Sequence, residues 1–282
     1  MMGLNIVFFG SPEFAAESLT TLLGSEHRVT AIVSQPDRPK GRGGSTSPTP
    51  VSILAEIHNI KLFRPEKVRD KAFIEELSQI PADIFVVAAY GQFLNNKLLN
   101  MARYGAVNVH ASLLPKYRGA SPAASAILNG DETTGVTIMQ MERGMDTGAI
   151  LHTEEIGIDI NDTCGSLTIK LAKLGGKALL RYLSSNVGAT CGRLQDPTAA
   201  TYAPLLTKEM GLIDTTQPAI KIHNQVRALN PWPGAYIQTN GGILKIWSTE
   251  IIGDKIIFNE VQPPNGKRMP YAEYLKGHKI LI

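Results

Sequence analysis

The feature that most constrains the fold is an alternation of apolar, strand-like runs with helix-like segments. Residues 5–9 (NIVFF) form a run that is continuously apolar after Asn5, as in a strand buried on both faces, and residues 28–34 (RVTAIVS) form a second, β-branched run. Between these runs, Phe14, Leu19 and Leu22 recur at helical spacing. Strand, helix and strand in such close succession form a βαβ unit, and this unit predicts a parallel sheet.

The same alternation continues through the first two thirds of the chain. Further strands are expected over residues 82–89, 105–110 and 135–141. Further helices are expected over residues 50–57, 71–77, 95–101, 122–128 and 162–184. The pattern predicts an α/β fold with a Rossmann-like, doubly wound and mostly parallel sheet over residues 1–188.

The composition changes after this region. Residues 189–206 lack periodicity and are interpreted as a linker. Short strands separated by turns follow at 234–239, 242–247, 250–252 and 255–261, so residues 207–282 are expected to form a small, OB-like β-barrel domain. The loop 37–49 is rich in Gly, Ser and Pro, which is typical of a functional or disordered segment.

Residues that could carry chemistry gather around the predicted strand 105–110. Asn108 and His110 share one face of this strand, and they stand at its carboxyl end, where open α/β sheets bind their ligands. His110 could accept a proton, and the Asn108 amide could donate to a developing oxyanion. Asp146 follows a later strand in a glycine-flanked loop, where its carboxylate could orient His110 and increase its basicity.

These three residues suit acyl transfer to an amine, because a directly attacking amine needs a base and an oxyanion donor but no Ser or Cys nucleophile. Each residue also has a structural alternative. His110 could be a structural hydrogen bonder, and Asp146 could be a turn residue. Lys116 and Arg118 could be solvated loop charges or ligand contacts. On residues alone, the chain remains a transferase-like or hydrolase-like α/β enzyme.

Several classes are disfavoured by what the sequence lacks. The turn after the first strand reads GSPEF, not G-x-G-x-x-G, which argues against an NAD-dependent oxidoreductase. Two cysteines, Cys164 and Cys191, make neither a disulfide framework nor a metal set, so we expect no metal. No secretory signal and no apolar run of about 20 residues is present, so we expect a cytoplasmic protein without a membrane span.

Longer motifs resemble a known family. The stretch NVHASLLPKYRGASP resembles the signature of the formyltransferases that use 10-formyltetrahydrofolate. The segments FFGSPEFA, QPDRPKGRG, AAYGQFL and DETTGVTIMQMERGMDTGAIL match that family in order and spacing, and together they cover most of residues 4–155. The later segments ATYAPLLTKE, RALNPWPGAY, LKIW and GKRMPYAEYLKG look like the methionyl-tRNA formyltransferase branch.

The resemblance implies a formyl transfer from 10-formyltetrahydrofolate to the α-amino group of methionine on initiator methionyl-tRNA. His110 would be the general base, Asp146 would hold it, and Asn108 would stabilise the oxyanion. The implied folate contacts are Ala89, Tyr90, Gly91, Gln92, Leu94, Ser112, Leu113, Leu114 and Pro115. The implied tRNA contacts are Lys40, Arg42, Lys208, Lys267 and Arg268. We expect the protein to act as a monomer.

The sequence departs from the family in two places. The second half of the loop 37–49 is GGSTS, where other members often carry further lysines, and the segment 247–260 leaves little room for the extra hairpin of many members. A sugar-nucleotide amine formyltransferase using the same folate is the alternative from the same chemistry. A noncatalytic tRNA-binding protein is the alternative from another class, although Asn108, His110 and Asp146 are all intact.

The charge of the chain is unevenly distributed. The net charge of +3 is small, with 28 Lys+Arg against 25 Asp+Glu in 282 residues. Residues 207–282 contain nine Lys or Arg and six Asp or Glu, so the whole excess lies in the proposed tRNA-holding domain. Because phosphate contacts come from local clusters, this distribution is compatible with tRNA binding.

Overall fold

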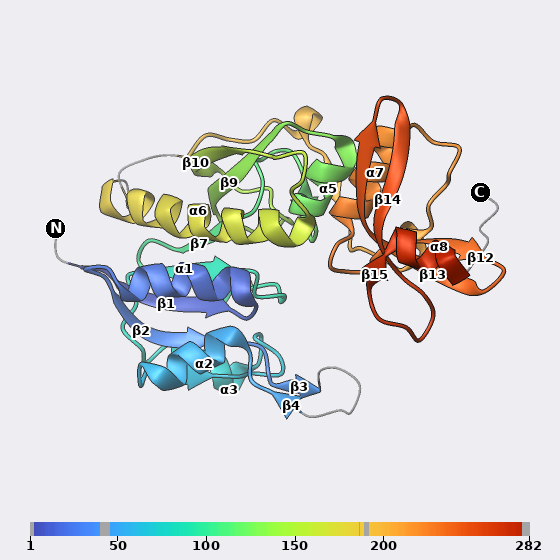
Figure 1. The fold of residues 1–282 in the computed structure, drawn as a ribbon. Coiled ribbons are helices and arrows are strands. Elements are labelled where there is room, and N and C mark those ends of the chain that lie inside the picture. Colours follow the sequence, from blue (N-terminus) through green and yellow to red (C-terminus); the bar gives the residue numbers. More distant parts are fainter. Residues whose placement is uncertain (1–2, 40–45, 186, 189–191, 278–282) are drawn as a thin grey trace. The chain divides into compact units, whose positions relative to one another are not determined.

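The predicted sheet is present in the computed structural model of the chain, which describes residues 3–39, 46–185, 187–188 and 192–277. Seven strands form it in the order β10-β9-β7-β6-β1-β2-β5 (Figure 1). Their bounds are β1 Asn5–Gly10, β2 Arg28–Val33, β5 Leu62–Phe63, β6 Ile84–Ala88, β7 Ala106–His110, β9 Thr133–Gln140 and β10 Ile150–Gly157. The two-stranded pair β3 (Arg38–Pro39) and β4 (Thr46–Ser47) stands apart from this sheet.

The strands are connected by helices, and some of these begin at a side chain that caps the first turn. They are α1 Glu13–Leu23, α2 Pro50–Ile57, α3 Lys71–Leu77, α4 Asn96–Leu99, α5 Pro122–Asn129 and α6 Cys164–Ser185. The Thr49 side chain accepts from the Ser52 amide at the start of α2, and Asp70 accepts from Ala72 at the start of α3. These bonds satisfy amides that have no partner inside the helix.

Two adjacent glycines let α6 pack closely against its neighbours. A Cβ atom on Gly175 would lie 2.8 Å from a methyl of Val109 in β7, and a Cβ atom on Gly176 would overlap the Thr21 side chain of α1. The absence of side chains at both positions therefore brings α6 against α1 and against one face of β7. Figure 1 shows α1 and α6 on the same side of the sheet. Asn108 and His110, which alternate with Val109, belong to the opposite face of β7.

The mostly parallel character of the sheet is confirmed. β1 pairs in parallel with β2 and with β6, and β6 pairs in parallel with β7. β9 departs from this direction, because it runs antiparallel to β7 and places Gln140 opposite Val107 and Thr137 opposite His110. The edge strand β10 was not expected from the sequence, where its residues follow the Asp146 loop.

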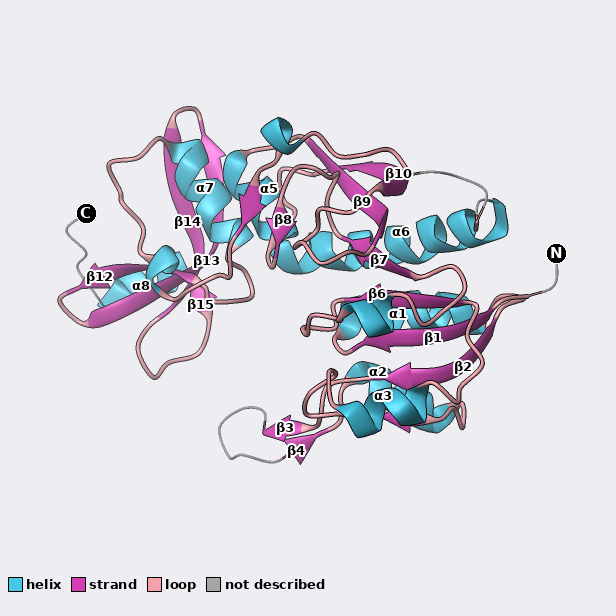
Figure 2. Ribbon diagram, turned by 180° about the vertical axis from the view of Figure 1, so that it is seen from behind, coloured by secondary structure: helices cyan, strands magenta, loops and turns pink. Residues whose placement is uncertain are grey.

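The C-terminal part of the chain is β-rich, as expected. It contains a four-stranded antiparallel sheet in the order β12-β13-β14-β15 (Figure 2). The strands are β12 Ala235–Thr239, β13 Gly242–Ile252, β14 Lys255–Gln262 and β15 Met269–Pro270, with helices α7 Ala219–Ala228 and α8 Tyr271–Gly277. The segments 242–247 and 250–252 form one strand, whose register with β14 shifts around Ser248. Short pieces complete the chain: β8 Arg118–Gly119, β11 Tyr202–Ala203, and the 3-10 turns Pro197–Ala199 and Glu209–Gly211.

The described chain groups into two compact units that do not follow chain order. The first contains Met1–Arg118, Gly135–Ile156 and Ile169–Thr201, and the second contains Gly119–Thr134, Gly157–Thr168 and Tyr202–Ile282. In the second unit, buried Arg227 of α7 donates to the carbonyl oxygens of Asp159 and Asp162 at 3.1 and 3.2 Å. This side chain therefore ties the segment 157–168 to the later part of the chain. None of the described helices combines the length and apolar character needed to cross a membrane.

His27 makes the start of the sheet sensitive to pH. The Leu4 amide donates to His27 Nδ1 at 3.2 Å, so the fold uses the neutral ring. Burial lowers the pKa of His27, and the Glu26 carboxylate opposes part of that effect. The unfolded chain therefore binds the proton more readily, and the stabilising contribution, complete above about pH 6.5, is lost as pH falls through the folded pKa.

We expect the Tm of the native chain to fall more steeply between pH 7 and pH 5 than the Tm of a His27→Asn variant. The expected difference is small, because the ring is only half-buried. Thermal unfolding followed across this pH range checks the prediction. Parallel profiles for the two proteins would show that His27 does not contribute.

Candidate active site

The candidate site lies where three parallel strands end. Gly10 at the end of β1 pairs with Ala88 at the end of β6, and Val87 of β6 pairs with Asn108 of β7. The loops that follow β6 and β7 therefore leave from the same edge of the sheet. This edge is where open α/β sheets bind ligands.

His110 is the last residue of β7, and its side chain is held on two sides. Its Nε2 atom lies 3.0 Å from the carbonyl oxygen of Tyr117, and its Nδ1 atom lies 3.6 Å from Asp146 Oδ2. Because a carbonyl oxygen can only accept, Nε2 must carry the proton of the neutral ring, and the lone pair of Nδ1 is on the Asp146 side. Nδ1 is therefore the atom that can take a proton, and the carboxylate would then stabilise the resulting imidazolium.

The loop that carries Asp146 has to return along β7. Gln140 ends β9 opposite Val107, three positions before His110, so the loop covers roughly 10 Å to reach the histidine. Asp146 has a left-handed φ of 53°, which Asp tolerates better than most residues. A Cβ atom on Gly148 would overlap the carbonyl oxygen of Gln140, so the return of the loop requires glycine there.

Asn108 supplies amide donors on the same face of β7 as His110. Its side chain is half-buried, and it has no hydrogen-bond partner among the residues that the structure describes. Its N–H groups can therefore donate to an oxygen of a bound molecule. A donor next to a base is the arrangement that stabilises a tetrahedral oxyanion while a proton is removed.

The turn after β7 is fixed by a buried threonine from β9. Thr137 Oγ1 accepts from the Leu114 amide at 3.1 Å and donates to the Ser112 carbonyl at 2.7 Å. Ser112 Oγ donates to the Lys116 carbonyl at 2.6 Å, and Leu114 packs in a small apolar cluster with Met139 and Ile150. Leu113 and Pro115 are half-buried in the same turn, and the Leu114-Pro115 peptide is cis.

The loop after β6 exposes backbone groups at two positions with positive φ. Ala89 and Gly91 are exposed and have positive φ values of 43° and 84°. Tyr90 and Leu94 turn into the apolar core, where burial raises the pKa of the Tyr90 phenol. The Gln92 side chain accepts from the Val68 amide at 2.8 Å, and this bond connects the loop to the segment before α3. A ligand at this loop could therefore meet the peptide groups of Ala89 and Gly91 and also the Phe93 side chain, which is 66% exposed.

No three His, Cys, Asp or Glu side chains come together as possible metal ligands within the described part of the chain. A histidine base, an adjacent carboxylate and an amide donor are chemically sufficient for transfer of an acyl group to an amine.

Comparison with known proteins decides the family. The family described as "Formyl transferase" matches residues 4–183, and "Formyl transferase, C-terminal domain" matches residues 205–257. A protein named methionyl-tRNA formyltransferase from Clostridioides difficile (strain 630) is 38% identical over 98% of both chains. The chain belongs to the methionyl-tRNA formyltransferase family.

Two solved structures share the fold of this formyltransferase. A methionyl-tRNA formyltransferase from Clostridium thermocellum superposes with a TM-score of 0.65 at 16% identity, covering 93% of this chain and 99% of that one. A sugar 3N-formyl transferase, crystallised in the presence of dTDP and 5-N-formyl-THF, superposes with a TM-score of 0.68 at 21% identity, covering 93% and 94%. At these identities the likeness concerns the fold alone.

The candidate site contains contacts of Gln195 and Arg118 that the sequence did not predict. Gln195, in the expected linker, donates to the carbonyl oxygens of Asp146 and Gly148. Arg118 is neither a solvated charge nor exposed to a ligand, because it is buried and donates to Gln195. The sequence could not predict either contact, because a single Gln in a Gly-, Thr- and Pro-rich segment has no feature that distinguishes it from other linker residues.

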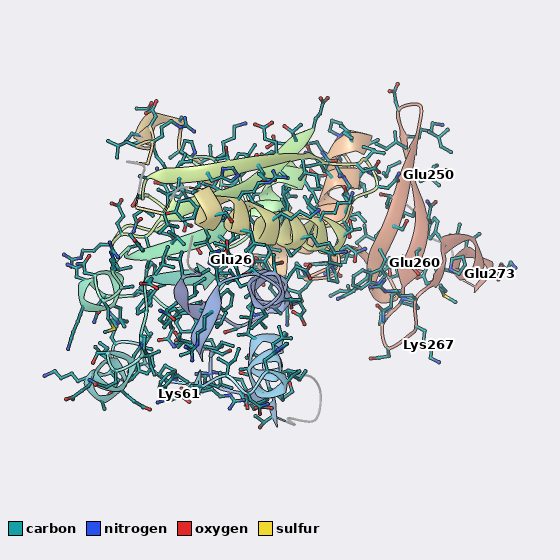
Figure 3. All side chains as sticks on the ribbon, turned by 90° about the vertical axis from the view of Figure 1, so that its left-hand side faces the viewer. Glu26, Lys61, Glu250, Glu260, Lys267 and Glu273 are labelled. Carbon is teal, nitrogen blue, oxygen red and sulfur yellow. The ribbon has the colours of Figure 1, made fainter. Side chains whose placement is uncertain are left out.

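The expected tRNA contacts of the formyltransferase are separate from this site in sequence. Lys208 and Lys267 are exposed, and Lys267 lies in the loop between β14 and β15 (Figure 3). The Arg268 guanidinium lies 3.7 Å from the centre of the Trp247 ring and 3.6 Å from Glu260 Oε2. Lys40 and Arg42 lie outside the described residues.

Proposed function

We propose that this chain transfers the formyl group of 10-formyltetrahydrofolate to the α-amino group of methionine on initiator methionyl-tRNA. One observation carries the proposal: His110 Nδ1 and Asp146 Oδ2 lie 3.6 Å apart in a chain of this family, and the nearby Asn108 amide has no hydrogen-bond partner among the described residues. The relative named methionyl-tRNA formyltransferase matches over 98% of its length, and the family's C-terminal domain matches residues 205–257 of this chain. The product, formylmethionyl-tRNA, would serve translation initiation.

Each of the three residues has a step in this reaction. The methionine nitrogen attacks the formyl carbon, and the carbonyl oxygen takes up the electron pair of its double bond. The Asn108 amide donates to this oxyanion. His110 Nδ1 accepts a proton from the attacking nitrogen, and Asp146 stabilises the imidazolium. As the carbonyl reforms, the bond from the formyl carbon to the folate nitrogen breaks, and His110 returns the proton to that leaving nitrogen.

The two loops at the carboxyl edge would border the folate. Ala89 and Gly91 offer backbone groups on one side, and residues 112–115 form a rigid turn on the other. Peptide donors and acceptors held in fixed positions suit a flat heterocycle such as a pterin, which has both kinds of group on its rim. Gln92 and Leu94 would support this pocket from behind.

The second unit would hold the tRNA. Residues 207–282 carry the whole positive excess of the chain, and Lys208, Lys267 and Arg268 are exposed within it. Because Arg268 also lies over the Trp247 ring, its guanidinium is oriented before any phosphate arrives. Lys40 and Arg42 would add local charge from the first unit. We further propose that the protein acts as a monomer in the cytoplasm.

The test is a transfer assay with 10-formyltetrahydrofolate and initiator tRNA charged with methionine. We expect formylmethionyl-tRNA from the free amine and no product from the same tRNA with an acetylated methionine, since the nitrogen must attack. A dTDP-linked amino sugar is the second acceptor, because a sugar N-formyl transferase shares the fold. Formylation of the sugar and not of the tRNA would overturn the proposal in favour of the sugar-nucleotide alternative.

A further inference from the structure

The side chain of Gln195 connects the segment after α6 to the Asp146 loop. Its Nε2 donates to the carbonyl oxygen of Asp146 at 2.9 Å and to that of Gly148 at 2.7 Å. One primary amide therefore holds the loop on both sides of Thr147. Within the loop itself, Thr147 Oγ1 donates to Glu142 Oε1 at 2.7 Å, and Gln195 adds a connection from a segment about 50 residues later in the chain.

Arg118 fixes which way this amide points. Its Nε and Nη2 atoms both donate to Gln195 Oε1, at 3.0 and 2.7 Å, and Arg118 as a whole is only 5% exposed. Because the fork of two donors occupies the amide oxygen, the NH₂ group must face the two loop carbonyls. The orientation of Gln195 is thus determined by a buried cation and not by solvent.

The two sides of the His110 ring are linked through this pair of residues. Tyr117, whose carbonyl accepts from Nε2, directly precedes Arg118 in the chain. Asp146, whose carboxylate faces Nδ1, is held by Gln195. A displacement of Gln195 would therefore change the distance between His110 and Asp146 without touching either side chain.

We propose that Gln195 is a positioning residue that holds the Asp146 loop against His110, with Arg118 as its anchor. The inference rests on the proposed function, because it assigns Gln195 a part in presenting the base and its carboxylate. Transfer depends strongly on such placement, since a displacement of about 1 Å can cost on the order of 10²-fold in rate.

Two variants separate positioning from stability. Gln195→Glu keeps an acceptor for Arg118 but has no N–H for the loop carbonyls, and Gln195→Met has neither. We expect both to lower kcat by about 10- to 100-fold, with the KM for 10-formyltetrahydrofolate within about twofold of the native value. The Tm of Gln195→Glu should stay near the native value, because its carboxylate still pairs with Arg118. Leu194→Ala, at a neighbouring position that is 84% exposed, is the matched control and should change nothing.

A second measurement does not depend on the acceptor. Amide hydrogen exchange of residues 141–149 should be faster in both Gln195 variants than in the native chain and in Leu194→Ala, with other regions unchanged. Native kcat in Gln195→Glu, or unchanged exchange in this segment, would overturn the inference. A loss of kcat accompanied by a general fall in Tm and by faster exchange everywhere would also overturn it in favour of a purely structural role. If the native chain formylates neither acceptor, the proposed function fails, and the exchange result alone decides the placement of the loop.

Discussion

His110→Ala is expected to lower the kcat of formyl transfer by about 10²- to 10⁴-fold, the range that removal of a general base produces. The reason is specific to one atom. The Tyr117 carbonyl holds the proton on Nε2, so Nδ1 is the basic nitrogen, and no other described imidazole lies at the end of β7. Single-turnover transfer to methionyl-tRNA measures the effect on chemistry directly.

A second substitution at this position keeps the test independent of folding. His110→Ala leaves the buried Tyr117 carbonyl without its donor, which itself costs stability. His110→Gln retains an N–H that can donate to that carbonyl but has no basic nitrogen, so it should lose the same rate while keeping its Tm. His58→Ala, at the exposed C-terminal end of α2, is the control. Near-native turnover in His110→Gln would remove His110 from the role of base.

Asp146→Asn is expected to reduce kcat by about 10²- to 10⁴-fold, comparable to the loss when a carboxylate beside a catalytic histidine becomes an amide. The substitution keeps the size of the side chain, and Asn adopts a left-handed φ as readily as Asp, so the loop at φ 53° should be preserved. What is lost is the negative charge 3.6 Å from His110 Nδ1, which would stabilise the imidazolium.

The same transfer assay measures this effect, with thermal unfolding as the check on folding. Asp254→Asn, in the exposed turn between β13 and β14, removes one carboxylate elsewhere and should leave kcat unchanged. If Asp146→Asn kept more than about a third of the native rate, the carboxylate would have no part in the proton transfer.

The parallel half of the sheet was predictable because buried strands leave a strong signal. Residues 6–9 and 84–88 are apolar without interruption, and the structure buries them on both faces. Period-two alternation likewise placed Asn108 and His110 on one face of β7. The direction of β9 was not predictable, since apolar periodicity is the same for parallel and antiparallel strands. The strand β10 was not predicted for a different reason. Apolar and polar residues do not alternate regularly in its sequence, ILHTEEIG, so the period-two pattern of a half-buried strand is absent.

The contacts of Asp146 show where sequence reasoning ends. The number of residues between His110 and Asp146 is compatible with many loop paths. The observed path depends on the antiparallel direction of β9 and on Gly148, where any side chain would overlap the Gln140 carbonyl oxygen. The sequence places Gln195 in a linker, because the residues around it show no helical or strand periodicity and this indicates only that the segment as a whole is irregular. A single amide that bridges Arg118 and two carbonyls is a three-dimensional relation, and no local pattern encodes it.

The second compact unit has a consequence for how the chain is made. Its helix α5 buries Pro122 through Ile127, and Gly130 at its end lies against Asn224 of α7, where an added Cβ atom would be 3.1 Å from the amide nitrogen. About 100 residues separate the two helices, so at roughly 5–20 residues per second α5 leaves the ribosome about 5–20 s before α7 exists. During that interval the part of α5 that α7 covers in the native fold is without that partner, and exposed apolar surface of this kind favours non-native association.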